Sequence, residues 1–211
     1  MSDTEKAAAL LEAAGETFAD ESGIRLDDKP APLYRLLVLA VLLSSRVQAS
    51  LGTSACRELV EAGFGTPERM RGADRREVVD ALDRARYTRM DEQTADALQE
   101  GAGLVVERWS GDLRRMRAAA DGDAEALAGF LTAMPRLGPV GADVFTREVQ
   151  RVWPEFRPHL DAKALEGAAA VGLPGDAATL ACLVEGDDLA RFSAALVRAN
   201  RDGDVVAQVS S

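Results

Sequence analysis

The sequence is poor in the side chains from which metal centres are built. Its 211 residues include one histidine and two cysteines, Cys56 and Cys182, with no Cys-x-x-Cys pair. Zinc ions and iron–sulfur clusters are held by clusters of histidine and cysteine ligands, so neither centre can be assembled from this chain. We therefore expect no metal and no cofactor, and we interpret both cysteines as free buried thiols.

Aromatic residues are also scarce, at 5% of the chain, and no segment alternates convincingly between apolar and polar residues. Alanine and leucine dominate the apolar positions, and both favour helices, whereas strands are rich in aromatic and β-branched residues. The 47% hydrophobic content is enough to bury a real core. The sequence therefore predicts an all-α fold.

Long hydrophobic runs are missing. The most apolar stretch, Leu33–Leu43, is interrupted by Arg35 and falls short of the roughly 20 residues that span a bilayer. No secretory signal pattern precedes it. We expect a monomeric protein that makes no membrane contact and lies in the cytoplasm, associated with the nucleoid.

Positive charge is in deficit: 25 lysines and arginines stand against 35 acidic residues, for a net charge of -10. A nucleic-acid-binding protein normally presents a basic face, so this balance argues against DNA as a partner. The charge is uneven, however. The segment Arg69–Arg89 holds seven arginines and four acidic residues, which leaves +3. Either this segment is a basic face, or its arginines are ordinary solvated side chains.

Helical periodicity recurs along most of the chain. The expected helices cover Thr4–Phe18, Leu33–Leu43, Ser50–Ala62, Arg75–Ala85, Asp91–Trp109, Asp112–Met116, Leu127–Met134, Ala177–Val184 and Leu189–Ala199, with short helices after Thr66-Pro67 and after Asp161. Ala118–Glu125 reads as a mobile acidic loop and Asp204–Ser211 as a loose tail. We expect two helical lobes: residues 30–149, and residues 1–29 together with 150–211.

A glycine-rich turn stands between two of these helical patterns. Met134-Pro135 closes the first pattern, Gly138-Pro139-Val140-Gly141 forms the turn, and Ala142 begins the second. Glycine lets the backbone approach a ligand closely, and the start of a helix offers unpaired N–H groups and a positive dipole end. The pattern indicates a helix-hairpin-helix. The turn is either a simple connector or a site for a DNA phosphate.

Residues 134–142 resemble the Leu-Pro-Gly-Val-Gly-Pro-Lys-Thr-Ala hairpin of the endonuclease III-like DNA glycosylases, the helix-hairpin-helix (HhH-GPD) superfamily of base-excision repair. Leu160-Asp161 is similar to the Val-Asp that carries the catalytic aspartate of that family. Residues 36–46 resemble its apolar helix ending in Leu-Leu-Ser-Ala-Gln, and residues 85–87 its Gly-Leu-Tyr turn. The resemblance implies a two-lobed helical DNA glycosylase fold that contacts double-stranded DNA.

The sequence also departs from the family pattern. Val140 stands where bifunctional members have the lysine that attacks the sugar, Arg136 replaces the first glycine of the hairpin, and Arg46 replaces the glutamine that fills the gap left by a flipped base. The four-cysteine iron–sulfur loop is absent. Without the lysine, the resemblance implies a monofunctional glycosylase that hydrolyses the N-glycosidic bond of a damaged or modified base and leaves an abasic site.

Asp161 is the catalytic residue that the resemblance implies, because a carboxylate near the sugar stabilises its developing positive charge. Spacing alone favours a helix N-cap for Asp161, and the two roles are compatible because one carboxylate can cap a helix and still face a cleft. Arg46 and Arg86 are candidates to fill the gap that a flipped base leaves in the duplex. For Arg46, a solvated side chain at a helix end is an equally supported alternative. The remaining DNA-binding candidates are Arg136, Leu137, Gly138, Pro139, Val140, Gly141 and Lys163. The alternative functions are a catalytically inactive DNA-binding protein and a helical protein unrelated to DNA.

Overall fold

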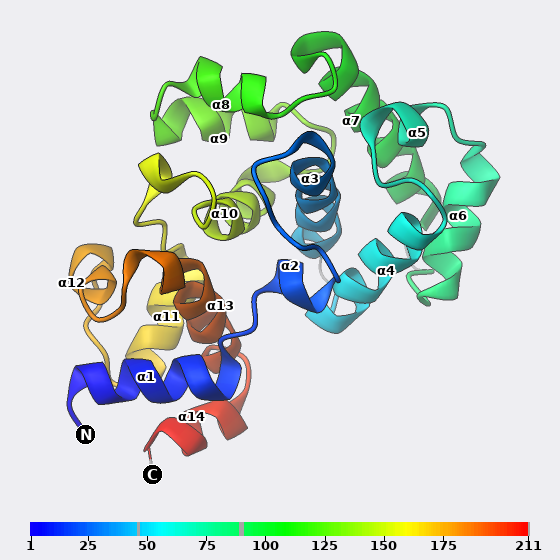
Figure 1. Cartoon of the computed structure of the whole chain (residues 1–211). Helices are drawn as coiled ribbons and strands as arrows, with labels where there is room; N and C mark the ends of the chain where they lie inside the picture. Colours follow the sequence, from blue (N-terminus) through cyan, green and yellow to red (C-terminus); the bar gives the residue numbers. More distant parts are fainter. Residues whose placement is uncertain (46, 89–90, 211) are drawn as a thin grey trace. The chain divides into compact units, whose positions relative to one another are not determined.

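A computed structural model describes residues 1–45, 47–88 and 91–210, and within these ranges every regular element is a helix (Figure 1). The all-α class predicted from the sequence is confirmed. The described helices do not include one that is both long and apolar enough to cross a membrane. The chain divides into two compact units, one made of Met1–Phe18 with Thr146–Ser211 and the other of Ala19–Phe145. The lobe boundaries predicted from the sequence, at residues 30 and 149, stay a prediction.

The first unit is organised around its last long helices. Its elements are α1 (Asp3–Ala14), η1 (Pro154–Phe156), α11 (Ala162–Ala170), α12 (Ala177–Ala181), η2 (Gly186–Asp188), α13 (Leu189–Ala199) and α14 (Gly203–Ser210). Residues 192–197 of α13 are all buried, and α1, α11 and α14 pack against this helix. Helix α13 is therefore the core of this unit.

The C-terminal tail is a helix, which corrects the expectation of a loose end. Helix α14 packs on α1 and α13 (Figure 1). Val205 and Val209 are buried, at 9% and 1% exposure. Because they are four residues apart, both lie on the same face of the helix. Burial of that face orders a segment that is too short to form a stable helix alone.

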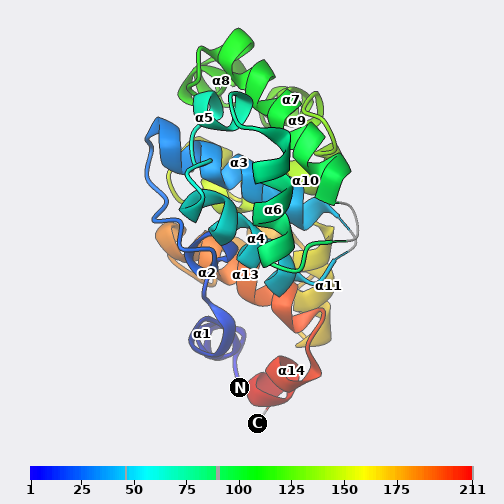
Figure 2. The ribbon, with the colours of Figure 1, turned by 90° about the vertical axis from the view of Figure 1, so that its right-hand side faces the viewer.

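The second unit carries most of the helices, seen from the side in Figure 2. Its elements are α2 (Phe18–Glu21), α3 (Pro30–Ser44), α4 (Ala49–Glu61), α5 (Pro67–Arg71), α6 (Arg75–Arg84), α7 (Asp91–Trp109), α8 (Arg114–Ala120), α9 (Ala124–Thr132) and most of α10 (Gly138–Val149). Thr66 and Asp74 cap α5 and α6, as their positions in the sequence predict, by accepting backbone N–H bonds from Arg69 and Arg76.

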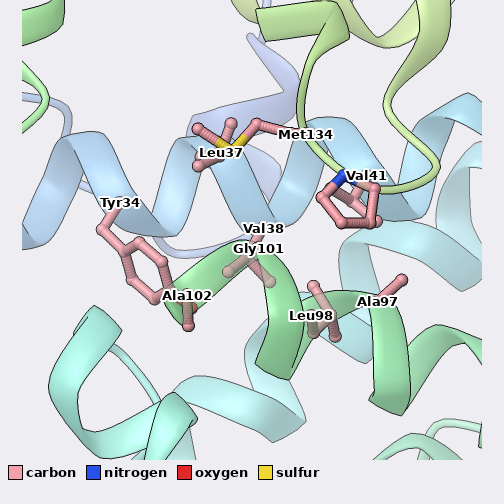
Figure 3. A pocket seen from close by; sticks show the side chains of 10 residues that line it. Tyr34, Leu37, Val38, Val41, Ala97, Leu98, Gly101, Ala102 and Met134 are labelled. Atoms are coloured by element: carbon pink, nitrogen blue, oxygen red, sulfur yellow. The ribbon is translucent and has the colours of Figure 1, made fainter. Parts of the chain in front are cut away.

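Helix α3 is the core of this unit, since residues 36–42 are all buried. It packs on α4 and α7. Figure 3 shows the apolar side chains of α3 facing α7, with Met134 beside Leu37. A small apolar pocket is lined there by α3, α7, Met134 and Pro135. The two residues that precede the glycine-rich turn are therefore anchored on the core of the unit.

The segment expected to be a mobile acidic loop is largely helical. Helix α8 runs to Ala120, and α9 begins at Ala124. Asp121 and Gly122 turn the chain with φ of 48° and 77°, and the carboxylate of Asp123 accepts the N–H groups of Glu125 and Ala126. The expectation was wrong because the acidic residues serve as a C-terminal turn and an N-cap, not as solvated loop residues.

Candidate functional site

Residues 133–137 connect α9 to α10 within the second unit, and Gly138–Gly141, which were predicted to form the turn, are instead the first turn of α10. Two residues of this hairpin have left-handed backbone conformations, Arg136 with φ of 59° and Gly138 with φ of 47°. Glycine adopts this region freely, but a residue with a Cβ pays about 1–2 kcal/mol for it. Arg136 thus has a conformation that glycine adopts more readily, and neighbouring residues must hold it there.

The first turn of α10 is the accessible part of the hairpin. Pro139 and Val140 are exposed, Val140 to 40%, whereas Leu137 is buried and anchors the loop. The first N–H groups of a helix have no carbonyl acceptors within the helix, so this turn presents backbone donors and a positive dipole end to its surroundings. The geometry suits an anion such as a phosphate.

Two side chains from the core helices hold the loop at Arg136. The hydroxyl of Ser44, the last residue of α3, donates to the carbonyl oxygen of Arg136 at 3.0 Å. The guanidinium of Arg136 donates to Oε1 of Gln93 in the first turn of α7 at 2.9 Å. The ends of α3 and α7 and the hairpin therefore meet at one point of the second unit.

Asp161 lies in the first unit, where it is the N-cap of α11. Its Oδ1 accepts the N–H of Ala164 at 3.0 Å, so the capping role that spacing allowed is present. Its Oδ2 accepts a hydrogen bond from Arg147, and the two side chains are only 5% and 3% exposed. Both carboxylate oxygens are engaged, and water is nearly excluded. The catalytic role of Asp161 stays a prediction.

Arg147 belongs to a buried polar group that the sequence did not reveal. Every residue from 146 to 150 is buried, although four of the five are polar. Arg147 and Arg198 both lie over the ring of Phe18, at 5.5 Å and 4.3 Å from its centroid, and Glu148 accepts the N–H of Phe18. A helical period assigns polar residues to solvent, so no local pattern could have indicated this burial.

The backbone of His159, the only histidine of the sequence, is hydrogen-bonded to the side chain of Gln150. The amide of Gln150 donates to the carbonyl oxygen of His159 at 3.0 Å, and its Oε1 accepts the N–H of His159, also at 3.0 Å. This reciprocal pair ties the segment before α11 to the end of α10. Lys163 lies in the first turn of α11 and is half-buried.

The arginine-rich segment is less basic than its composition indicates. Three of its arginines form ion pairs with acidic residues outside the segment: Arg71 with Glu107, Arg75 with Glu92 and Asp96, and Arg84 with Glu58. These four acidic partners outnumber the predicted excess of +3 charges. The positive potential that this face can offer to DNA is correspondingly reduced.

Of the two arginines predicted to fill the gap left by a flipped base, the structure describes only Arg86. Arg46 lies outside the described residues. Arg86 is exposed and has a left-handed backbone, with φ of 61°. Its neighbour Tyr87 is 2% exposed and donates to the carbonyl oxygen of Leu42 at 3.4 Å, which identifies Tyr87 as a packing residue.

Among the described residues, no cluster of three or more histidine, cysteine or acidic side chains is arranged to hold a metal ion.

Comparison with solved structures identifies the fold. The chain is similar to the protein of a trapped endonuclease III–DNA covalent intermediate, the estranged-adenine complex, over 93% of this chain and 85% of that one, with a TM-score of 0.51 and 15% sequence identity. No protein-family model and no curated protein matches the sequence. The protein therefore has an endonuclease III-like, all-helical fold, as the resemblance of its motifs implied.

Proposed function

We propose that this protein binds double-stranded DNA through the hairpin between α9 and α10. It would be a catalytically inactive DNA-binding protein with the fold of a base-excision-repair glycosylase. The observation that carries the binding is the first turn of α10, where Pro139 and Val140 are exposed and the N–H groups of Gly138 and Val140 have no acceptor within the helix. Arg136 adds a guanidinium on the same loop. Contacts of this kind go to phosphates, so we expect binding with little sequence preference.

The observation that argues against excision is the buried ion pair of Asp161. Stabilising an oxocarbenium-like sugar requires a carboxylate that faces the sugar without a neutralising partner. The guanidinium of Arg147 is paired with Oδ2, and the N–H of Ala164 in α11 donates to Oδ1. The pair supports the proposal of binding without excision, which reverses the order that the sequence alone favoured.

Monofunctional excision is the second candidate, supported by the endonuclease III-like fold and by an aspartate at the head of α11. In that reaction Arg147 would release the carboxylate, which would then orient water and stabilise the sugar as the bond to the base breaks. Val140 has no amine, so no Schiff base with the sugar would form at that position. The product would be an abasic site in an unbroken strand.

The test of binding is a salt titration of the affinity for a fluorescent duplex. The variant Val140→Glu places a carboxylate in the first turn of α10, where it favours the helix but repels phosphate. We expect its affinity to fall about tenfold at low salt, with unfolding unchanged, while the uncharged control Val140→Gln retains the wild-type affinity. Absence of wild-type binding even at low salt would refute the proposal.

The test of excision uses duplexes that carry uracil, alkylated, oxidised or mismatched bases, treated with alkali after incubation. Binding without strand scission on the whole panel is the expected result. Scission that is lost in Asp161→Asn, measured where this destabilised variant still has the helical content of wild type by circular dichroism, would establish the second candidate instead.

A further inference from the structure

Ser44 contacts the hairpin at two places, at Arg136 before α10 and at Gly141 in the first turn of α10. Its hydroxyl is shared between the carbonyl oxygens of Val41, at 2.7 Å, and of Arg136, at 3.0 Å. Its Cβ also lies 3.2 Å from the position that a Cβ would take at Gly141. The last turn of α3 therefore bonds to the loop before α10 and packs closely on the first turn of α10 itself.

Close packing explains why position 141 is a glycine. A Cβ there would also meet Cδ1 and Cγ of Leu137, at 2.8 Å and 2.9 Å. Leu137 is buried and cannot move aside without opening the core. Gly141 and Leu137 thus fix the distance between α3 and α10, and that distance brings the hydroxyl of Ser44 to the carbonyl oxygen of Arg136.

The hydrogen bond matters because Arg136 does not favour its own conformation. A residue with a Cβ leaves the left-handed region when nothing holds it there. Ser44 holds the carbonyl oxygen of Arg136, and Gln93 holds its side chain. Rotation of this residue would redirect the amides of the turn that follows it.

We infer that Ser44 is a positioning residue for DNA: it keeps the hairpin in the conformation that presents the first turn of α10 to a phosphate. The inference rests on the proposed DNA binding. Ser44 acts through the loop and not by contact with the nucleic acid. Its removal lowers the fraction of molecules whose loop is ready to bind, and the apparent affinity falls by that fraction.

The experiment compares Ser44→Ala with Ser45→Ala in the full chain. The two serines are adjacent and both half-buried, but among the described contacts only the hydroxyl of Ser44 bonds to the hairpin. Loss of one hydrogen bond is expected to raise the Kd for a duplex about fivefold in Ser44→Ala, with no change in Ser45→Ala. The salt dependence of Kd should be unchanged, because the number of phosphate contacts stays the same.

A second measurement tests the inference without DNA. Amide hydrogen exchange at Leu137, Gly138, Val140 and Gly141 should be faster in Ser44→Ala than in wild type or Ser45→Ala, because the loop opens more often. Equal exchange and equal affinity in both variants would overturn the role of Ser44. If wild type fails to bind DNA while exchange changes as expected, the proposed function fails and the positioning of the loop by Ser44 stands.

Discussion

The guanidinium of Arg147, near the end of α10, and the carboxylate of Asp161, at the head of α11, form an ion pair that is almost closed to water. The same carboxylate caps α11 through the N–H of Ala164. A buried pair of this kind loses much more when one partner is removed than it contributes as a pair, because the remaining charge stays desolvated. The main effect of breaking the pair is therefore expected on the free energy of unfolding.

Replacement of Asp161 by Asn should be strongly destabilising. Asn caps a helix as well as Asp does, so the change isolates the ion pair and leaves Arg147 buried without its partner. We expect the free energy of unfolding to fall by about 3–5 kcal/mol in urea titrations. The control is Asp176→Asn at the exposed N-cap of α12, where we expect a change within about 0.5 kcal/mol. A similar small loss at both positions would contradict the structural role of the pair.

Two helical glycines should respond in opposite ways to alanine. A Cβ at Gly103 in α7 meets nothing within 4 Å, so Gly103→Ala should stabilise the protein by about 0.5–1 kcal/mol through helix propensity. A Cβ at Gly167 in α11 would lie 1.8 Å from the carbonyl oxygen of Leu196, so Gly167→Ala should destabilise it by several kcal/mol, on the order of 3. Thermal unfolding of both variants measures the difference, and a stable Gly167→Ala would show that α11 and α13 are less closely packed.

The two cysteines should differ in reactivity. Cys56 is buried as expected, and burial raises the pKa of its thiol to about 12, whereas Cys182 is exposed, so the expectation that both thiols are buried was wrong for Cys182. The thiolate is the reactive form, so at pH 8 Cys56 should remain protonated and unreactive in the folded chain. An aromatic disulfide reagent should label one thiol in the native protein and two in urea. Labelling of both thiols under native conditions would show that α4 opens readily.

Val140→Lys should strengthen DNA binding. The residue is 40% exposed at the first turn of α10, so a lysine there can reach a phosphate without disturbing the core. One added phosphate contact should steepen the dependence of log Kd on log salt by about 0.9. The uncharged Val140→Gln should keep the wild-type slope. An unchanged slope in the lysine variant would place the DNA elsewhere on the molecule.

The same variant also probes excision. Borohydride traps a Schiff base between a lysine and an abasic sugar. With Asp161 held by Arg147, we expect no trapped complex with any damaged duplex, and a trapped complex would support the second candidate. Wild-type protein with valine at position 140 is the matched control.

Much of the local structure could be predicted because it depends on residues a few positions apart. The bounds of α7 and α13 and the caps at Thr66 and Asp74 follow from capping residues and periodicity, whereas the turn predicted at Gly138–Gly141 belongs to α10. The order of the motifs also indicated the endonuclease III-like fold. The sequence by itself determined most of the helices, their order and the presence of a hairpin, but it did not reveal α2 or α14.

Which partner each charged side chain has was decided only by the tertiary structure. Asp161 meets Arg147 across 14 residues, and Arg75 and Arg84 meet acidic partners more than 15 residues away. Helical periodicity carries no information about such pairs, because it reports only which face a residue occupies on its own helix. Whether a carboxylate is a helix cap, an ion-pair partner or a group able to act on a sugar depends on what folding brings beside it.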